Sequence, residues 1–136
     1  MVKISIEYTG SLHCSAVHGP SKAKVETDAP VDNNGKGESF SPTDLVATAY
    51  GACMATIMGI IAQKNQVELK GMKIEVVKEM SADSPRRISK LTTNFTIPLP
   101  KAHPKRELIE TAALSCPVHH SIHPEIQRAV NFQWQE

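Results

Sequence analysis

The chain has 136 residues, with 15 lysines and arginines against 14 aspartates and glutamates, a formal net charge of +1. That length predicts one domain, residues 1–136, able to bury a core without disulfides or metals. The near-neutral charge gives no reason to expect nucleic acid or an anionic membrane as partner. The start of the chain has no signal-peptide pattern, and the cysteines are odd in number: Cys14, Cys53 and Cys116. We therefore expect free thiols and a cytoplasmic location.

The N-terminal segment predicts three short strands. Apolar residues alternate with polar ones over residues 2–8, 12–16 and 23–27, which is typical of strands with one buried face. A Gly-, Asn- and Pro-rich stretch over residues 29–37 predicts a long loop. In the first strand we expect the following side chains to be buried: Val2, Ile4, Ile6 and Tyr8.

Residues 41–65 predict the long helix around which the rest of the chain packs. Ser41 can act as N-cap, Pro42 suits the first helical position, and Asp44 stands where a capping-box acid belongs. Residues 45–62 carry no charge, so we expect a helix that is almost wholly buried. A membrane span is the alternative, but modest hydrophobicity and the lack of a flanking Lys/Arg cluster favour a core helix.

Small residues recur every four positions along this predicted helix. Such a face lets another backbone approach closely, and the approaching element is either a sheet or a second copy of the helix. The residues that form this face are Ala47, Gly51, Ala55 and Gly59.

The second half of the chain predicts two strands, a helix, a helical turn and a closing strand. Apolar residues alternate over residues 72–76, 91–97 and 126–134, and the proline at 98 is expected to end the middle strand. A helix should begin near Pro104, with an apolar stripe formed by Leu108, Ile109, Ala112 and Ala113. Pro117 interrupts that helix, and a short helical turn is expected over residues 117–122. Segregated runs of this kind predict an α+β fold with mainly antiparallel sheet.

Two cysteines stand in contexts with a chemical meaning. Cys116 directly precedes Pro117, beside the start of a helical turn whose unpaired N–H groups would stabilise a thiolate and lower its pKa. Cys53 lies in mid-helix, where activation must come from neighbours in the fold. Each cysteine alone could also be a small buried hydrophobe, and for Cys14 we favour that interpretation.

Several histidines follow Cys116 in the sequence. His119 lies three residues after it and His123 four further on, a spacing that could suggest a metal site. A closed zinc site needs four ligands, and no second ligand pair accompanies these residues, so we predict neither metal nor cofactor. His119 could instead tune the Cys116 thiol, whereas His120 and His123 are expected to be surface or capping residues.

Two segments together, SPTDLVATAYGACMATI and SCPVHHSI, resemble the paired cysteine motifs of the OsmC/Ohr family. In that family the first cysteine lies in a proline-led helix, and the second lies in a C-P-x-x motif after the next long helix. The matching positions here are Cys53 and Cys116. The predicted order of elements is similar to that fold over essentially the whole chain. The resemblance implies an intertwined homodimer with sheets wrapped around long central helices and active sites at the dimer interface.

The resemblance also implies an activity. Cys53 would attack a small hydrophobic hydroperoxide and become a sulfenic acid, and Cys116 would resolve it as a disulfide that a dithiol then reduces. A cysteine-based peroxidase in oxidative-stress defence is therefore our first hypothesis. The alternative is a non-catalytic dimer on the same scaffold that binds a small molecule or senses redox state.

The sequence departs from the peroxidases of the family at two charged positions. They carry a glutamate directly after the proline of the long helix, where this chain has Thr43. They also carry an arginine in the loop after the second strand, and the matching residues 18–22 contain none. Without such a pair, the pKa of Cys53 in an apolar helix would be raised. The residues that could substitute are His18, Lys22, Glu38 and Asp44.

Overall fold

The computed structural model describes all 136 residues of the chain. They form two compact units, residues 1–46 and residues 47–136. The boundary falls inside helix α1 (Pro42–Lys64), whose first turn belongs to the first unit and whose remainder belongs to the second. Two helices and two three-stranded sheets make the fold α+β, as predicted.

The first unit is an antiparallel three-stranded sheet. Its strands are β1 (Ile4–Gly10), β2 (His13–His18) and β3 (Lys24–Asp28), in the order β1-β2-β3. Each strand pairs with the one before it in sequence, which confirms the three predicted strands. The predicted loop contains the short 3₁₀ helix η1 (Val31–Asn33).

One face of this first sheet is apolar and exposed. Ile4, Ile6 and Tyr8 are 62%, 67% and 63% exposed, and Val2 before the strand is 63% exposed. The prediction that these residues are buried is therefore wrong for the single chain. The alternation correctly indicated an apolar face, but no second layer of this unit covers it.

Helix α1 starts with the predicted capping box. The Oγ atom of Ser41 accepts the N–H of Asp44 at 3.1 Å, and the Asp44 carboxylate accepts the N–H of Ser41 at 2.9 Å. At the other end Lys64 is the last helical residue, and the Asn65 side chain donates to the carbonyl of Ile61 at 2.9 Å. Both predicted ends of the helix are confirmed.

Only one face of α1 is buried in the single chain. The buried residues are Ala47, Tyr50, Gly51, Met54, Met58 and Ala62. The opposite face is uncharged but exposed, and it consists of Thr48, Ala49, Ala52, Thr56 and Ile60. The prediction of an almost wholly buried helix is thus wrong for one copy of the chain. By length and hydropathy the helix could cross a membrane, a test that core helices of soluble proteins also pass.

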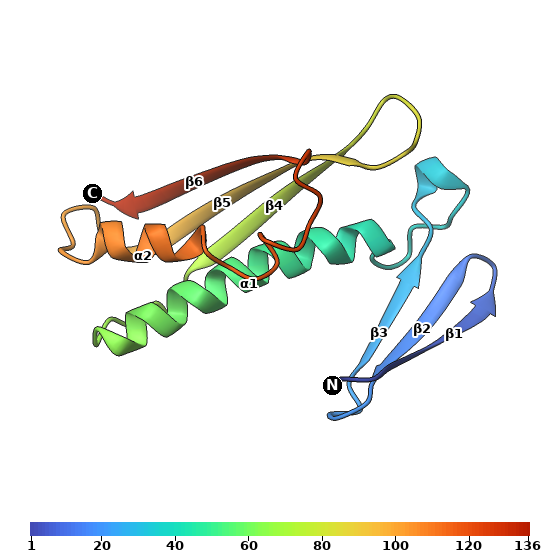
Figure 1. The fold of residues 1–136 in the computed structure, drawn as a ribbon, viewed down its shortest axis with the longest axis horizontal. Helices are drawn as coiled ribbons and strands as arrows, with labels where there is room; N and C mark the ends of the chain where they lie inside the picture. The colour runs from blue at the N-terminus through green and yellow to red at the C-terminus, as the bar shows by residue number, and fades with distance from the viewer. The chain divides into compact units, whose positions relative to one another are not determined.

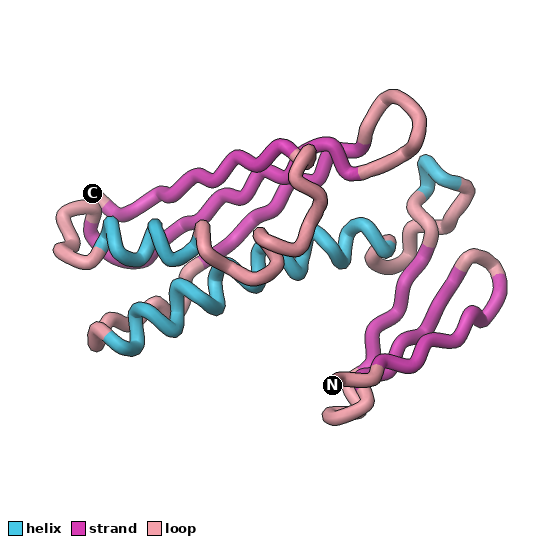
Figure 2. The backbone as a smooth tube through the Cα atoms, viewed as in Figure 1, coloured by secondary structure: helices cyan, strands magenta, loops and turns pink.

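The second unit contains a sheet with one antiparallel and one parallel pairing. Strand β4 (Lys73–Met80) pairs antiparallel with β5 (Ile88–Pro100), and β5 pairs parallel with β6 (Gln127–Gln135). A parallel neighbour requires a crossover, which α2 (Arg106–Ala113) and the loop 114–126 provide. Figure 2 shows no helix in that loop, and the short helical turn predicted at 117–122 is a hydrogen-bonded turn in which the N–H groups of Ser121 and Ile122 donate to the carbonyl of Val118.

Both helices lie on the same side of the second sheet (Figure 1). The inward face of β5 was predicted correctly, since Leu91, Thr93, Phe95 and Ile97 are all buried. A hydrogen bond connects α2 to β6: the carboxylate of Glu110 on α2 accepts the indole N–H of Trp134 on β6 at 2.7 Å. The core of this unit also includes Met54, Met58 and Ala62 of α1 and Ile109 and Ala113 of α2.

Two details of the second unit differ from the predictions. Leu108 is 45% exposed, because only the other three members of the predicted stripe face the core of the short helix α2. Strand β5 continues through Pro98, because its pairing with β4 ends at Thr96 and its pairing with β6 is irregular after Ile97. The proline therefore removes no ladder hydrogen bond.

Candidate functional site

The second unit brings together the two cysteines that sequence reasoning selected. Cys53 lies in the middle of α1, and Cys116 lies in the loop that follows α2. Their side chains are neighbours, since the Cys53 thiol is one of the groups that raise the pKa of Cys116, and both cysteines are free. Cys116 is completely buried, whereas Cys53 is partly exposed. Cys14 belongs to β2 in the first unit.

Cys116 receives the backbone contacts that its position before Pro117 predicted. The N–H of His119 donates to its Sγ atom at 3.2 Å, and the N–H of Val118 also favours the thiolate. Burial nevertheless raises the pKa of the Cys116 thiol, and the Cys53 thiol beside it raises the pKa further. The predicted lowering of this pKa is therefore wrong in net direction, because burial outweighs the two amides.

An aromatic pair stands beside the thiols. Tyr50, one turn before Cys53 on α1, has its hydroxyl 3.5 Å from Nδ1 of His119, and the two rings stack with centroids 6.2 Å apart. Burial raises the pKa of Tyr50, and the positive charge of Arg128 opposes that rise. Burial lowers the pKa of His119, and Arg128 and His120 lower it further, so the imidazole is neutral at neutral pH. The contact of His119 with Cys116 is made by its backbone N–H.

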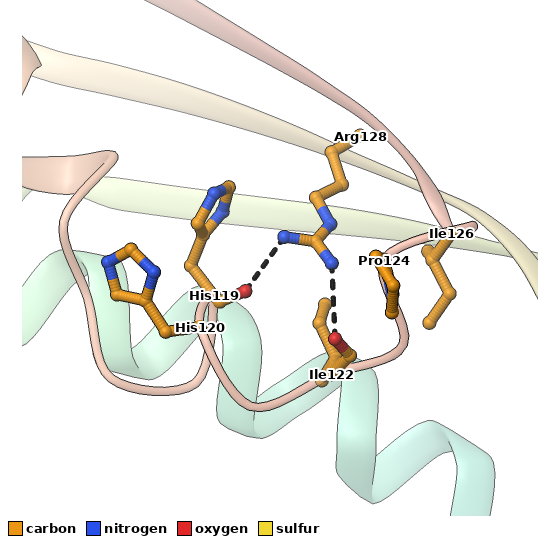
Figure 3. A pocket seen from close by; sticks show the side chains of 6 residues that line it. All are labelled: His119, His120, Ile122, Pro124, Ile126 and Arg128. Atoms are coloured by element: carbon orange, nitrogen blue, oxygen red, sulfur yellow. Dashed lines mark hydrogen bonds between the residues drawn. The ribbon is translucent and has the colours of Figure 1, made fainter.

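Arg128 holds the loop that carries Cys116. Figure 3 shows its guanidinium group, from the start of β6, directed at the backbone of the loop. It donates to the carbonyl of His119 at 2.7 Å, of His123 at 3.0 Å and of Ile122 at 3.3 Å. Sequence reasoning missed this residue. The signal was available, because Arg128 shares the inward parity of the apolar residues Val130, Phe132 and Trp134.

The remaining candidate residues have local roles in the first unit. His18 contacts residues of the β2–β3 turn. Its Nδ1 lies 2.6 Å from Oγ of Ser21, and its carbonyl accepts the N–H of Lys22 at 2.8 Å. The N–H of Glu38 donates to Asp28 at 2.9 Å. Asp44 accepts within the capping box described above.

The histidines after Cys116 do not assemble into a metal site. No group of three or more His, Cys, Asp or Glu side chains has a geometry that could hold a metal ion. Nδ1 of His123 accepts the N–H of Glu125 at 3.1 Å, a local turn contact. What the arrangement offers chemically is a pair of adjacent thiols, one reachable and one buried, which can interconvert with a disulfide.

The family profile of OsmC-like protein matches residues 35–131. Among solved structures, a protein of Psychrobacter arcticus provisionally described as an osmotic stress induced and detoxification response protein is 43% identical. The match covers 98% of this chain and 96% of that chain, with a TM-score of 0.92. No curated protein matches the chain.

More distant structures share the fold. The OsmC-like protein of Mycoplasma pneumoniae is 14% identical over 100% of this chain and 98% of that chain, with a TM-score of 0.81. The organic hydroperoxide resistance protein OsmC of Legionella pneumophila is also 14% identical, over 98% of this chain and 96% of that chain, with a TM-score of 0.75. At these identities the similarity establishes the architecture alone.

Proposed function

Because the chain belongs to the OsmC-like protein family, we propose that it reduces organic hydroperoxides with the thiols of Cys53 and Cys116. The observation that carries this proposal is that the Cys53 thiol lies close enough to the Cys116 thiol to raise its pKa. The hydroperoxide resistance named for the Legionella relative supports the choice of substrate.

The difference in exposure assigns a role to each thiol. A substrate can reach the partly exposed Cys53, but it cannot reach the completely buried Cys116. Cys53 is therefore the attacking residue and Cys116 the resolving residue.

The reaction balances in three steps. The Cys53 thiolate attacks one oxygen of ROOH, the O–O bond breaks, Cys53–SOH forms, and RO⁻ takes a proton to leave as ROH. The Cys116 thiol then attacks the sulfenic sulfur, so that a disulfide forms and water leaves. A dithiol reduces the disulfide by exchange, becomes a disulfide itself and returns both protein thiols. A cytoplasmic location is part of this proposal, because dithiol reductants keep thiols reduced there.

A homodimer is also part of the proposal. One uncovered apolar surface is the β1 face formed by Ile4, Ile6 and Tyr8, and another is the uncharged exposed face of α1. Exposed apolar residues of this kind favour an interface, and a second copy of the chain is the partner that we propose. A single sedimenting species of monomer mass at micromolar concentration would contradict this part.

The redox proposal is tested on the reduced protein. Addition of cumene hydroperoxide should produce one Cys53–Cys116 disulfide per chain, mapped by mass spectrometry, and a dithiol should then sustain peroxide consumption. Absence of that disulfide together with absence of consumption under several dithiols would reject the activity.

Three variants separate the roles of the cysteines. Cys53→Ser should abolish consumption. Cys116→Ser should accumulate a sulfenic acid at Cys53 that dimedone traps. Cys14→Ser is the matched control, because Cys14 lies on β2 in the other unit, and it should behave like the unmodified chain.

A redox-sensing dimer is the second candidate. The raised pKa of Cys116 favours it, because slow disulfide formation suits a sensor better than a rapid peroxidase. The two candidates differ in turnover. A sensor forms the disulfide stoichiometrically and consumes no further peroxide when dithiol is supplied.

A further inference from the structure

A cavity opens beside the loop that carries Cys116. Its volume is about 540 Å³, which lies within the size range of small-molecule sites. Two kinds of side chain line it: three cationic or titratable ones and three apolar ones (Figure 3). They are His119, His120 and Arg128, and Ile122, Pro124 and Ile126.

Arg128 brings a positive charge that no carboxylate neutralises. Its three hydrogen bonds all go to backbone carbonyls, and it forms no ion pair. Those bonds use three of the five N–H groups that an arginine carries. Its Nε atom is buried and has no acceptor. A partly buried guanidinium in this state gains from an additional anionic acceptor, because charge-assisted hydrogen bonds are the strong ones.

Two histidines line the cavity together with Arg128. His119 and His120 contact each other edge to face, with ring centroids 5.4 Å apart. Burial, and after it Arg128 and His120, disfavour a proton on His119, so Arg128 is the fixed positive charge of the group. No acidic side chain lines the cavity. An anion placed among the three residues would meet the positive charge of Arg128 and would favour the protonated form of His119.

The remaining wall of the cavity defines the rest of the ligand. Ile122, Pro124 and Ile126 offer an apolar surface next to the cationic side. We propose that the cavity binds a small organic anion, a carboxylate with a short aliphatic chain, whose head group is held by Arg128 and the two histidines. This binding needs no reaction at the cysteines, so it stands or falls independently of the redox activity.

The test uses the reduced chain, octanoate as probe, and NMR titration of the assigned His119 and His120 side chains. Octanoate should bind and raise the pKa of His119, because a bound carboxylate favours the imidazolium. Octanol, which has the same chain length without the charge, should leave that pKa unchanged. Inorganic phosphate, which has the charge without the chain, should bind at least about threefold more weakly than octanoate.

Variants identify the groups that bind. Arg128→Met should weaken octanoate binding about tenfold, while Arg87→Met, at an exposed arginine paired with Asp83, should not. Since Arg128→Met removes three bonds to the loop, His120→Glu serves as a second variant at an exposed residue, and it should also weaken binding.

Four results would overturn the proposal. One is the absence of any shift at His119 and His120 with millimolar octanoate. A second is equal binding of octanol, which would leave only an apolar cavity. A third is binding of phosphate as strong as that of octanoate, which would remove the aliphatic part. The last is unchanged octanoate affinity in both Arg128→Met and His120→Glu.

Discussion

Nδ1 of His13 lies 2.6 Å from Oδ1 of Asp28, while Nε2 of the same ring lies 2.8 Å from Oε2 of Glu26. A neutral imidazole has one N–H, so carboxylates at both nitrogens require the doubly protonated ring. Oδ2 of Asp28 also accepts the N–H of Glu38 at 2.9 Å. His13 therefore links β2 to β3, and Asp28 links β3 to the loop that leads into α1.

We expect this contact to make the stability of the protein pH-dependent. Hydrogen bonds to Asp28 and Glu26 raise the pKa of His13 above 6.5, and the bond to His13 lowers the pKa of Asp28 below 3.8. The His13 contribution is complete below pH 6.5 and is lost as pH rises through the raised pKa. The Asp28 contribution is present above pH 3.8 and is lost as pH falls through the lowered pKa. Both contributions are present together between those values.

The measurement is denaturant unfolding from pH 3 to pH 9, combined with NMR titration of His13. His13→Gln should flatten the alkaline limb of the stability curve. His103→Gln is the control, because the side chain of His103 accepts a backbone N–H from Lys105 and contacts no carboxylate, so this variant should leave that limb in place. A His13 that titrates at or below pH 6.5 would refute the expectation.

Two glycines of α1 should respond oppositely to alanine. A Cβ atom at Gly51 would lie 2.6 Å from Cγ2 of Val76 on β4, and a β-branched side chain has little freedom to move away. Gly51→Ala should therefore lower the free energy of unfolding by about 1–3 kcal/mol. A Cβ atom at Gly59 meets nothing within 4 Å, so Gly59→Ala should raise it by up to about 1 kcal/mol.

Urea unfolding of the two glycine variants checks this contrast. The double variant Gly51→Ala/Val76→Ala should lose less than the sum of its parts, because removing the valine methyl groups makes room for the new Cβ. Equal losses at Gly51 and Gly59 would mean that α1 does not pack closely on β4.

The buried thiol should react with alkylating reagents only at alkaline pH. Burial raises the pKa of Cys116 above its ordinary value of 9.0, so its thiolate fraction at pH 7 is smaller than in an unfolded chain. Iodoacetamide labelling followed by peptide mapping should give a pH midpoint above 9.0 for Cys116. Cys53→Ala should move the midpoint downward, because the Cys53 thiol contributes to the rise. A midpoint below 9.0 in the folded chain would be inconsistent with this account.

The N-cap of α1 should make a measurable contribution to stability. Ser41→Ala removes the oxygen that accepts the N–H of Asp44, which should cost about 1 kcal/mol. Ser41→Thr should keep most of the stability, since threonine also caps. Ser5→Ala, at an exposed position of β1, is the neutral control. If Ser41→Ala and Ser5→Ala have the same melting temperature, the capping box does not stabilise the helix.

Features that depend on a few neighbouring residues could be predicted from the sequence. Ser41 and Asp44 are three residues apart, and a capping box needs nothing else. The inward face of β5 follows from parity alone, because side chains alternate along a strand. The pairing of Cys53 with Cys116 came from a resemblance of motifs, because no local pattern relates residues so far apart.

Features that depend on what covers a residue were predicted less well. Alternation identified Ile4, Ile6 and Tyr8 as one face, but a pattern does not say which layer covers that face. Likewise, the amides beside Cys116 were foreseen, whereas its burial arises from residues distant in sequence. The parallel pairing of β5 with β6 depends on the path of the crossover, and strand patterns alone do not specify that path.

The position of Arg128 has a consequence for the order in which the protein is assembled. Its three hydrogen bonds to the loop can form only after β6, the last strand of the chain, has docked beside β5. Cys53 and Cys116 are both synthesised before that strand. A nascent chain therefore contains both thiols before Arg128 can hold the loop that carries Cys116.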